Sequence, residues 1–220
     1  MHMLDRNSVN CPACLVPPTN GRRYGGLHTP EKNEVRDRLL ELQKERCAYC
    51  ERRTGRGRKD GHIEHFRKQA GNHDLELAWN NLFWSCLDEG TCGKHKDKCD
   101  RPHGSGPQAA FDPAELLDPC RDDPEDFLSF ISDGTVRPRD GVAADRTRRA
   151  TVTLRVFQLD TSPYLRQSRE DAVRPYIGAI DSLLPFGVEV VKSYVNREIL
   201  KIETAPFSTA IKHYLKGLIS

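Results

Sequence analysis

Two cysteine pairs bracket a short segment of histidines and glutamate, and this arrangement constrains the fold more than any other feature of the chain. The pairs are Cys47-Ala-Tyr-Cys50 and Cys86 with Cys92, and Gly61-His-Ile-Glu-His-Phe66 lies between them. Two thiolates on a tight turn are typical of zinc sites, and structural zinc takes four ligands. The spacing therefore predicts one structural Zn²⁺ on all four thiolates. Residues 87–91 should form a small loop, because the second pair is widely spaced.

The composition indicates a globular protein with one core, or one core and a small metal-held module. The chain has 220 residues, of which 37% are hydrophobic and 30% are charged. No apolar run approaches the ~20 residues that cross a bilayer, and residues 1–10 lack a signal-peptide pattern. We therefore expect a cytoplasmic protein with no membrane partner, in which the eight cysteines are thiols or zinc ligands and not disulfides.

Four further cysteines leave a second metal site open. Cys11-Pro-Ala-Cys14 is another pair with the spacing of a zinc knuckle, and Cys99 and Cys120 could complete a site with it. No spacing demands this grouping, so unpaired thiols are the simpler interpretation.

The net charge of +2 is unevenly distributed. Residues 52–68 carry seven Lys and Arg against two acids, whereas residues 112–126 carry seven acids against one Arg. A basic segment beside the candidate site favours a polyanion such as DNA. The alternative is an ordinary solvated loop.

The pattern of apolar residues and breakers predicts an α+β chain in four parts. These are an irregular, extended N-terminal arm (1–28), a helix plus the zinc-stapled core (29–101), an acidic linker and hairpin (102–140), and a C-terminal helical region (141–220). The first helix should begin at Thr29-Pro30-Glu31 and end near Arg46. A helix that begins at Ser162-Pro163 should kink or break at Pro175.

Four polar residues around the zinc ligands suggest hydrolytic chemistry: Glu64, His65, Asn81 and His95. A carboxylate and an imidazole can bind a divalent ion and leave positions open for water and a phosphate oxygen. A neutral histidine beside them can accept the proton of that water. Asn81 can orient the histidine or fix a turn. The alternative for His65 is a further zinc ligand without catalysis.

These residues resemble the HNH endonucleases, and more closely the HNH nuclease subunit (PtuB) of Septu antiphage defence systems and its retron-associated relatives. The resemblance implies a ββα-metal core with zinc-bound cysteines in a mostly helical chain. The motifs that carry it are Cys47-Ala-Tyr-Cys-Glu51, Gly61-His-Ile-Glu-His-Phe66, Trp79-Asn-Asn-Leu82, Ser85-Cys86 and Cys92-Gly-Lys-His-Lys96.

The resemblance also implies roles. His65 would be the general base, Asn81 the orienting residue, and Glu64 a ligand of catalytic Mg²⁺ or Mn²⁺ in place of the more usual aspartate. His95 would be the second ligand. The chain departs from the family pattern here, since many HNH proteins have the His or Asn ligand at the position of Gly93, two residues before His95. His62 is the alternative ligand, since it lies two residues before Glu64 on the same face of a strand.

As a partner, the resemblance implies an ATPase subunit of the PtuA type that controls access of the nuclease to DNA. We expect it to dock on residues 1–28 and the C-terminal helices, because irregular arms often order on a partner. Two other functions stay open: a non-catalytic zinc-stapled nucleic-acid-binding module, and a partner-docking scaffold. The Glu64-His65 pair favours the nuclease, because a binding module needs no general base.

Overall fold

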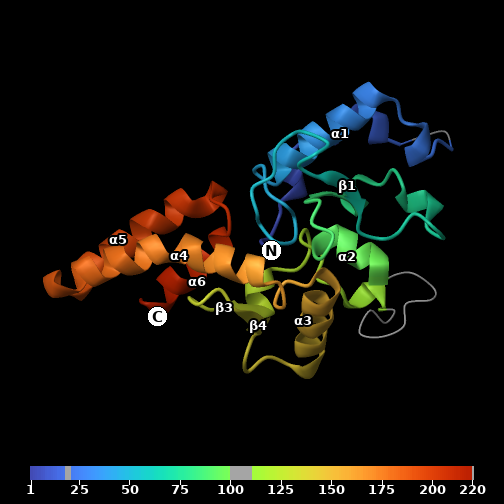
Figure 1. The fold of residues 1–220 in the computed structure, drawn as a ribbon. Coiled ribbons are helices and arrows are strands. Elements are labelled where there is room, and N and C mark those ends of the chain that lie inside the picture. The colour runs from blue at the N-terminus through green and yellow to red at the C-terminus, as the bar shows by residue number, and fades with distance from the viewer. Residues whose placement is uncertain (18–20, 100–110, 220) are drawn as a thin grey trace.

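The computed structural model describes residues 1–17, 21–99 and 111–219. It confirms the α+β class: two small antiparallel sheets lie among six α-helices of the described residues (Figure 1). The boundary expected at residues 101 and 102 lies outside the described residues. The elements in chain order are α1 (Thr29–Leu42), β1 (His62–His65), β2 (Leu82–Ser85), α2 (Cys92–Cys99), β3 (Leu128–Phe130), β4 (Val136–Pro138), α3 (Ala144–Phe157), α4 (Pro163–Leu183), α5 (Val188–Lys201) and α6 (Ser208–Gly217).

Helix α1 begins where the sequence predicts and ends earlier. The Glu31 carboxylate accepts a hydrogen bond from the backbone N–H of His28 at 2.7 Å, and Pro30 occupies the first turn. The helix ends at Leu42 and not near Arg46, because Lys44 and Glu45 both have positive φ angles, of 53° and 55°. This turn directs the chain into the first cysteine pair.

Strands β1 and β2 pair antiparallel and α2 follows them, so the order is strand, strand, helix. The register places His62 opposite Ser85, Glu64 opposite Phe83 and His65 opposite Leu82. Gly61 lies just before β1, where a Cβ atom would come within 2.5 Å of the Trp84 ring. Glycine is therefore required for Trp84 to cover the start of β1.

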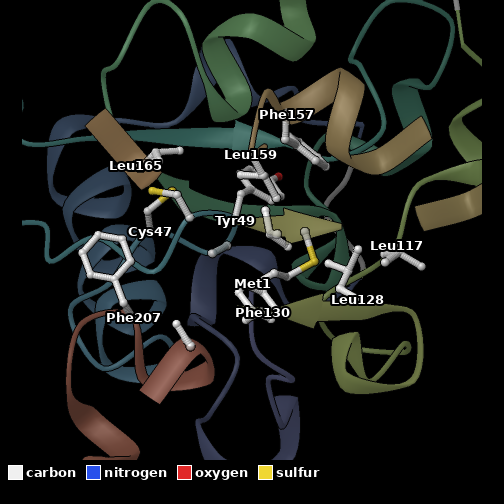
Figure 2. Close-up of a cluster of buried hydrophobic side chains, with 14 of the residues drawn as sticks. Met1, Cys47, Tyr49, Leu117, Leu128, Phe130, Phe157, Leu159, Leu165 and Phe207 are labelled. Atoms are coloured by element: carbon white, nitrogen blue, oxygen red, sulfur yellow. The ribbon is translucent and has the colours of Figure 1, made fainter. Parts of the chain in front are cut away.

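The turn between Cys47 and Cys50 lies at the centre of the largest hydrophobic cluster (Figure 2). Tyr49 is fully buried and stacks on Phe157 of α3, with ring centroids 4.1 Å apart. Leu128, Leu165 and Phe207 belong to the same cluster and come from β3, α4 and the residue before α6. The first cysteine pair is therefore built into the main core.

The N-terminal residues differ from the extended arm that their prolines and glycines suggested. Within residues 1–17 and 21–28 the regular elements are short 3₁₀ turns, but Met1 and Leu4 are buried in the main core. The Arg6 guanidinium lies 4.6 Å from the ring centres of both Trp79 and Phe83 and donates to the carbonyl of Leu82 at 2.6 Å. The buried side chains of Met1 and Leu4 and the contacts of Arg6 therefore hold this segment against the core. Secondary-structure propensity alone does not reveal such contacts.

The C-terminal helices form as expected, except that α4 continues through Pro175. Pro175 is exposed, so water can satisfy the carbonyl that loses its helical partner. Helices α4 and α5 run beside each other and project away from the strands (Figure 1). The hairpin at Asp133-Gly134 also forms, with β3 paired to β4 and Gly134 at φ +82°. None of the helices in the described part of the chain is long and apolar enough to cross a membrane.

Candidate metal centre and active site

The four cysteines expected to bind zinc lie together. The sulfur atoms of Cys47, Cys50, Cys86 and Cys92 are all within 4.8 Å of one another, and all four residues are buried. Cys50 and Cys86 are 4.0 Å apart. Tetrahedral zinc with Zn–S bonds of ~2.3 Å requires sulfur separations of about 3.8 Å. The group therefore fits one structural metal ion of the zinc type.

Local backbone geometry positions the four cysteines. The Cys47 N–H donates to the Arg52 carbonyl at 2.9 Å, which closes the first knuckle, and Cys92 starts α2 with φ +53°. Burial opposes ionisation of Cys47, but hydrogen bonds from the Cys50, Cys86 and Cys92 thiols outweigh it and hold the Cys47 pKa well below its ordinary value. Burial raises the pKa of Cys92. A cation is what would let several of these thiols ionise together.

The second cysteine group does not form among the described residues. Cys120 Sγ accepts a hydrogen bond from Arg6 Nε at 3.1 Å, and Cys99 Sγ lies 3.5 Å from His95 Nδ1. Within residues 1–17, 21–99 and 111–219, the metal-type cluster contains only the four cysteines of the first group. Cys11 and Cys14 are half-buried thiols.

Glu64 lies between two cationic or basic side chains and is only 2% exposed. Lys96 Nζ is 2.8 Å from Oε1, and His62 Nε2 is 3.1 Å from Oε2. Lys96 and Glu64 therefore form a buried ion pair, with side chains 1% and 2% exposed. Burial raises the pKa of Glu64, but the charge of Lys96 and the hydrogen bond from His62 together outweigh it, and the pKa falls below its ordinary value. Glu64 is therefore a buried carboxylate held in the ionised form.

Of the two histidines left open as partners of Glu64, His62 is the one beside it. Two ligands at right angles on Mg²⁺, each at ~2.1 Å, are about 3.0 Å apart, and His62 Nε2 and Glu64 Oε2 are separated by 3.1 Å. His95 faces α3 instead, with Nδ1 2.9 Å from the Val156 carbonyl. The contact between Glu64 and His62 is equally of hydrogen-bond length, and within the described residues neither side chain belongs to a group of three or more metal-type ligands.

His65 is buried and oriented by hydrogen bonds on both ring nitrogens. Nε2 lies 3.1 Å from the carbonyl oxygen of Glu76, and Nδ1 lies 3.1 Å from the side-chain nitrogen of Gln69. A carbonyl only accepts, so Nε2 carries the proton and Nδ1 is the acceptor. The edge of the Tyr24 ring packs against the imidazole at 4.7 Å. Burial lowers the pKa of His65, which favours the neutral ring.

Asn81 braces the loop between the two strands. Its Oδ1 accepts from the Arg67 N–H at 2.7 Å, and its Nδ2 donates to the carbonyls of Arg67 and Leu75 at 3.0 Å. The structure thus places Asn81 as the residue that ties down the turn, one of the two roles the sequence left open for it. The loop that it fixes carries Gln69 and Glu76, which hold His65.

Sequence reasoning missed Lys96, whose side chain is 1% exposed. Its ammonium also donates to the His65 carbonyl at 3.0 Å and to Asp97 Oδ1 at 3.2 Å. Lys96 lies four residues after Cys92, and side chains at that spacing share one face of a helix. The position of Cys92 as a metal ligand was therefore the signal that could have directed Lys96 toward the site.

No protein-family model matches this chain. A curated relative, the Septu protein PtuB of Bacillus mycoides (strain KBAB4), is 30% identical over 127 residues. The match covers 49% of this chain and 42% of the relative, so the chain spans less than half of that protein's length. The similarity supports a PtuB-like relationship, as the motifs around the cysteines and Glu64 suggested.

Proposed function

We propose that this chain is a metal-dependent HNH endonuclease that hydrolyses DNA phosphodiester bonds, and that it acts as the effector subunit of an antiphage defence complex with an ATPase. The similarity to a Septu PtuB supports the defence role. The sequence of β1, β2 and α2 around the four cysteines supports an HNH-type ββα-metal core.

The orientation of His65 carries the proposal. A general base needs an unprotonated nitrogen aimed at the substrate side and a proton on the other nitrogen. Two contacts support this role for His65: the Glu76 carbonyl fixes the proton on Nε2, and Nδ1 is an unprotonated acceptor that takes a hydrogen bond from the Gln69 amide, the position that the attacking water would occupy. An acceptor that takes a hydrogen bond from an amide N–H can take one from water in the same position.

In this proposal each residue of the site has a separate role in hydrolysis. Glu64 and His62 would hold Mg²⁺ or Mn²⁺, and His65 Nδ1 would accept the proton of the attacking water. The Glu76 carbonyl would stabilise the imidazolium that results, because Nε2–H remains bonded to it. The bound ion would supply Lewis-acid stabilisation of the phosphoryl charge. Asn81 acts indirectly, through the loop that carries Gln69 and Glu76.

The test is cleavage of double-stranded DNA by the purified full-length chain with Mg²⁺ or Mn²⁺, with and without the ATPase subunit. His65→Ala should lower the rate by ~10²–10⁴ and leave folding and DNA binding intact, because it removes only the proton acceptor. His73→Ala is the matched control, since His73 is an exposed histidine on the loop that follows β1. Undiminished cutting by well-folded His65→Ala protein would remove His65 from the mechanism.

The same preparations test the metal ligands through direct Mn²⁺ titration. Glu64→Ala and His62→Ala should weaken Mn²⁺ binding, whereas His95→Ala should leave it nearly unchanged, because His95 faces Val156. If His95→Ala weakens binding and His62→Ala does not, His95 is the second ligand.

A zinc-stapled nucleic-acid-binding module without catalysis is the second candidate. One observation favours it: the Lys96 ammonium already neutralises Glu64, and both side chains are almost fully buried. This candidate predicts DNA binding without cleavage under every metal and partner condition. The cleavage assay above therefore separates the two functions.

A further inference from the structure

The segment between the first cysteine pair and β1 is a basic loop, residues 52–60, that the proposed chemistry does not use. Arg52 is half-buried, and the other four cations of the loop are exposed: Arg53, Arg56, Arg58 and Lys59. Asp60 is the only acid within it. The loop thus presents a dense positive surface next to the metal centre.

Backbone contacts fix the shape of this loop. Cys47 N–H donates to the Arg52 carbonyl at 2.9 Å, and Thr54 N–H donates to the Glu45 carbonyl at 2.8 Å. At the far end the Asp60 carboxylate accepts from the Gly57 N–H at 2.9 Å. A Cβ at Gly57 would lie 2.7 Å from Asp60 Oδ2, so glycine lets the loop close around that carboxylate. The exposed cations therefore project from a preorganised turn.

Arg52 is the most firmly placed of the five cations. Its guanidinium lies 4.3 Å from the centre of the Tyr164 ring, and its Nη2 is 3.2 Å from Asp88 Oδ2. Stacking of this kind holds a guanidinium in one plane, which suits phosphate recognition. Arg52 forms one wall of a groove of about 400 Å³ that is also lined by Arg53, Thr54, Gly55, Lys59, Asp60, Cys86, Leu87 and Asp88.

The groove borders the proposed metal ligands. Cys86, which lines it, directly follows Ser85, and Ser85 pairs with His62 across the β1–β2 ladder. The groove therefore meets the hairpin at the end where His62 lies.

The charges around the groove are not balanced locally. Glu45 is shared by Arg53 at 3.3 Å and Arg56 at 3.9 Å, and Asp88 pairs with Arg52. With Asp60 as the third carboxylate, the five cations of the loop leave a net charge of +2. Such a surface attracts a polyanion.

We propose that this groove binds the phosphate backbone of duplex DNA and aligns the strand with His62 and Glu64. The inference rests on the proposed nuclease function and names the surface that would hold its substrate. The loop would contribute to the affinity for DNA and not to sequence specificity, because backbone contacts position a protein on DNA without reading the base sequence.

The experiment measures binding of the full-length chain to a labelled DNA duplex by fluorescence anisotropy, at several NaCl concentrations and without added divalent metal. The test variant is Arg52→Ala/Arg53→Ala/Lys59→Ala, which removes the three cations that line the groove. Each phosphate contact contributes about 0.9 to the slope of log K against log salt concentration. The triple variant should therefore lower the slope by about 2 to 3 and weaken binding at low salt at least about tenfold.

The matched control removes the same charge from the C-terminal helices, through Arg174→Ala/Lys192→Ala/Arg197→Ala. These side chains are exposed, so the control should change the slope by less than about 1. An unchanged slope in the loop variant, an equal loss in the control, or no DNA binding by the wild-type chain would overturn the proposal. The nuclease hypothesis fails separately: His65→Ala would then cut like wild type while the loop variant still loses its salt slope.

Discussion

Gly93 packs directly against the Glu64 carboxylate. A Cβ at this position would lie 2.6 Å from Glu64 Oε2 and 3.0 Å from Ser85 Oγ. Gly93→Ala should therefore push the carboxylate away from His62 and weaken Mn²⁺ binding by about 10–100-fold, as loss of supporting contacts does at metal sites. Adding Glu64→Asp, which is one methylene shorter, should restore part of the loss.

Calorimetric Mn²⁺ titration of wild type, both single variants and the double variant gives the coupling between positions 64 and 93. Gly178→Ala in α4 is the control, since nothing lies within 4 Å of a Cβ there. Strictly additive losses would show that Gly93 does not act through Glu64.

The ion pair between Lys96 and Glu64 predicts a stability effect. Removing one partner of a buried pair leaves an uncompensated charge and costs ~3–5 kcal/mol. Lys96→Met should therefore lower the free energy of unfolding by that amount, measured by urea denaturation. Lys96→Met/Glu64→Gln should lose less than the sum of its two single variants. Additive losses would mean that the two side chains do not interact.

At the residue scale, the sequence revealed the groups whose chemistry is recognisable at short spacing. The four cysteines and the Glu64-His65 pair belong to this class. Gln69, Glu76 and Lys96 were missed, because their roles arise only when a loop and a helix fold back onto β1. Which of His62 and His95 lies beside Glu64 also needed coordinates, since it depends on which way α2 faces.

At the scale of elements, β1, β2 and α2 are too short to be stable alone. The strands have four residues each and the helix has eight, and isolated pieces of that length are marginal in water. The cysteines join the loop after α1, the end of β2 and the start of α2. A metal on those cysteines would therefore cross-link three short segments that also meet in the main core.

The four-cysteine group should hold about one equivalent of zinc in the purified chain, measured by elemental analysis. Cys92→Ser should lose the zinc and lower the stability by several kcal/mol, because metal binding is coupled to folding. Cys14→Ser is the control, since Cys14 lies outside the four-cysteine group. Well-folded protein without zinc, or equal thermal stability of both variants, would contradict the assignment.

Sequence patterns located the helices better than their ends. The start of α1 followed from a proline and an acid in its first turn, whereas its end depended on positive φ angles at Lys44 and Glu45. Helix α4 continues through Pro175 because the side of α4 that carries Pro175 is exposed to solvent. Local propensity sets where helices are possible, and tertiary surroundings decide where they stop.

At the scale of the whole molecule, the N-terminal residues pack against the rest of the chain without a partner protein. Leu4 N–H donates to the Pro119 carbonyl at 2.7 Å, and the Tyr24 ring packs against His65. Deleting residues 1–28 would therefore open the core and uncover the proposed base. The surface for the expected ATPase is better sought where apolar side chains remain exposed.

Such side chains gather where α4 turns into α5, at the end that projects from the rest of the molecule (Figure 1). Leu184, Phe186 and Val188 are exposed there, Phe186 to 72%. If this turn docks on the ATPase subunit, Phe186→Asp should weaken co-purification with that subunit at least about tenfold, since buried aromatic residues often dominate interfaces. Folding and metal content should not change. Leu200→Asp is the control, because Leu200 is also exposed but lies near the other end of α5. Equal capture of Phe186→Asp and wild type would place the ATPase elsewhere, and loss of capture only in Leu200→Asp would move the contact to that end of α5.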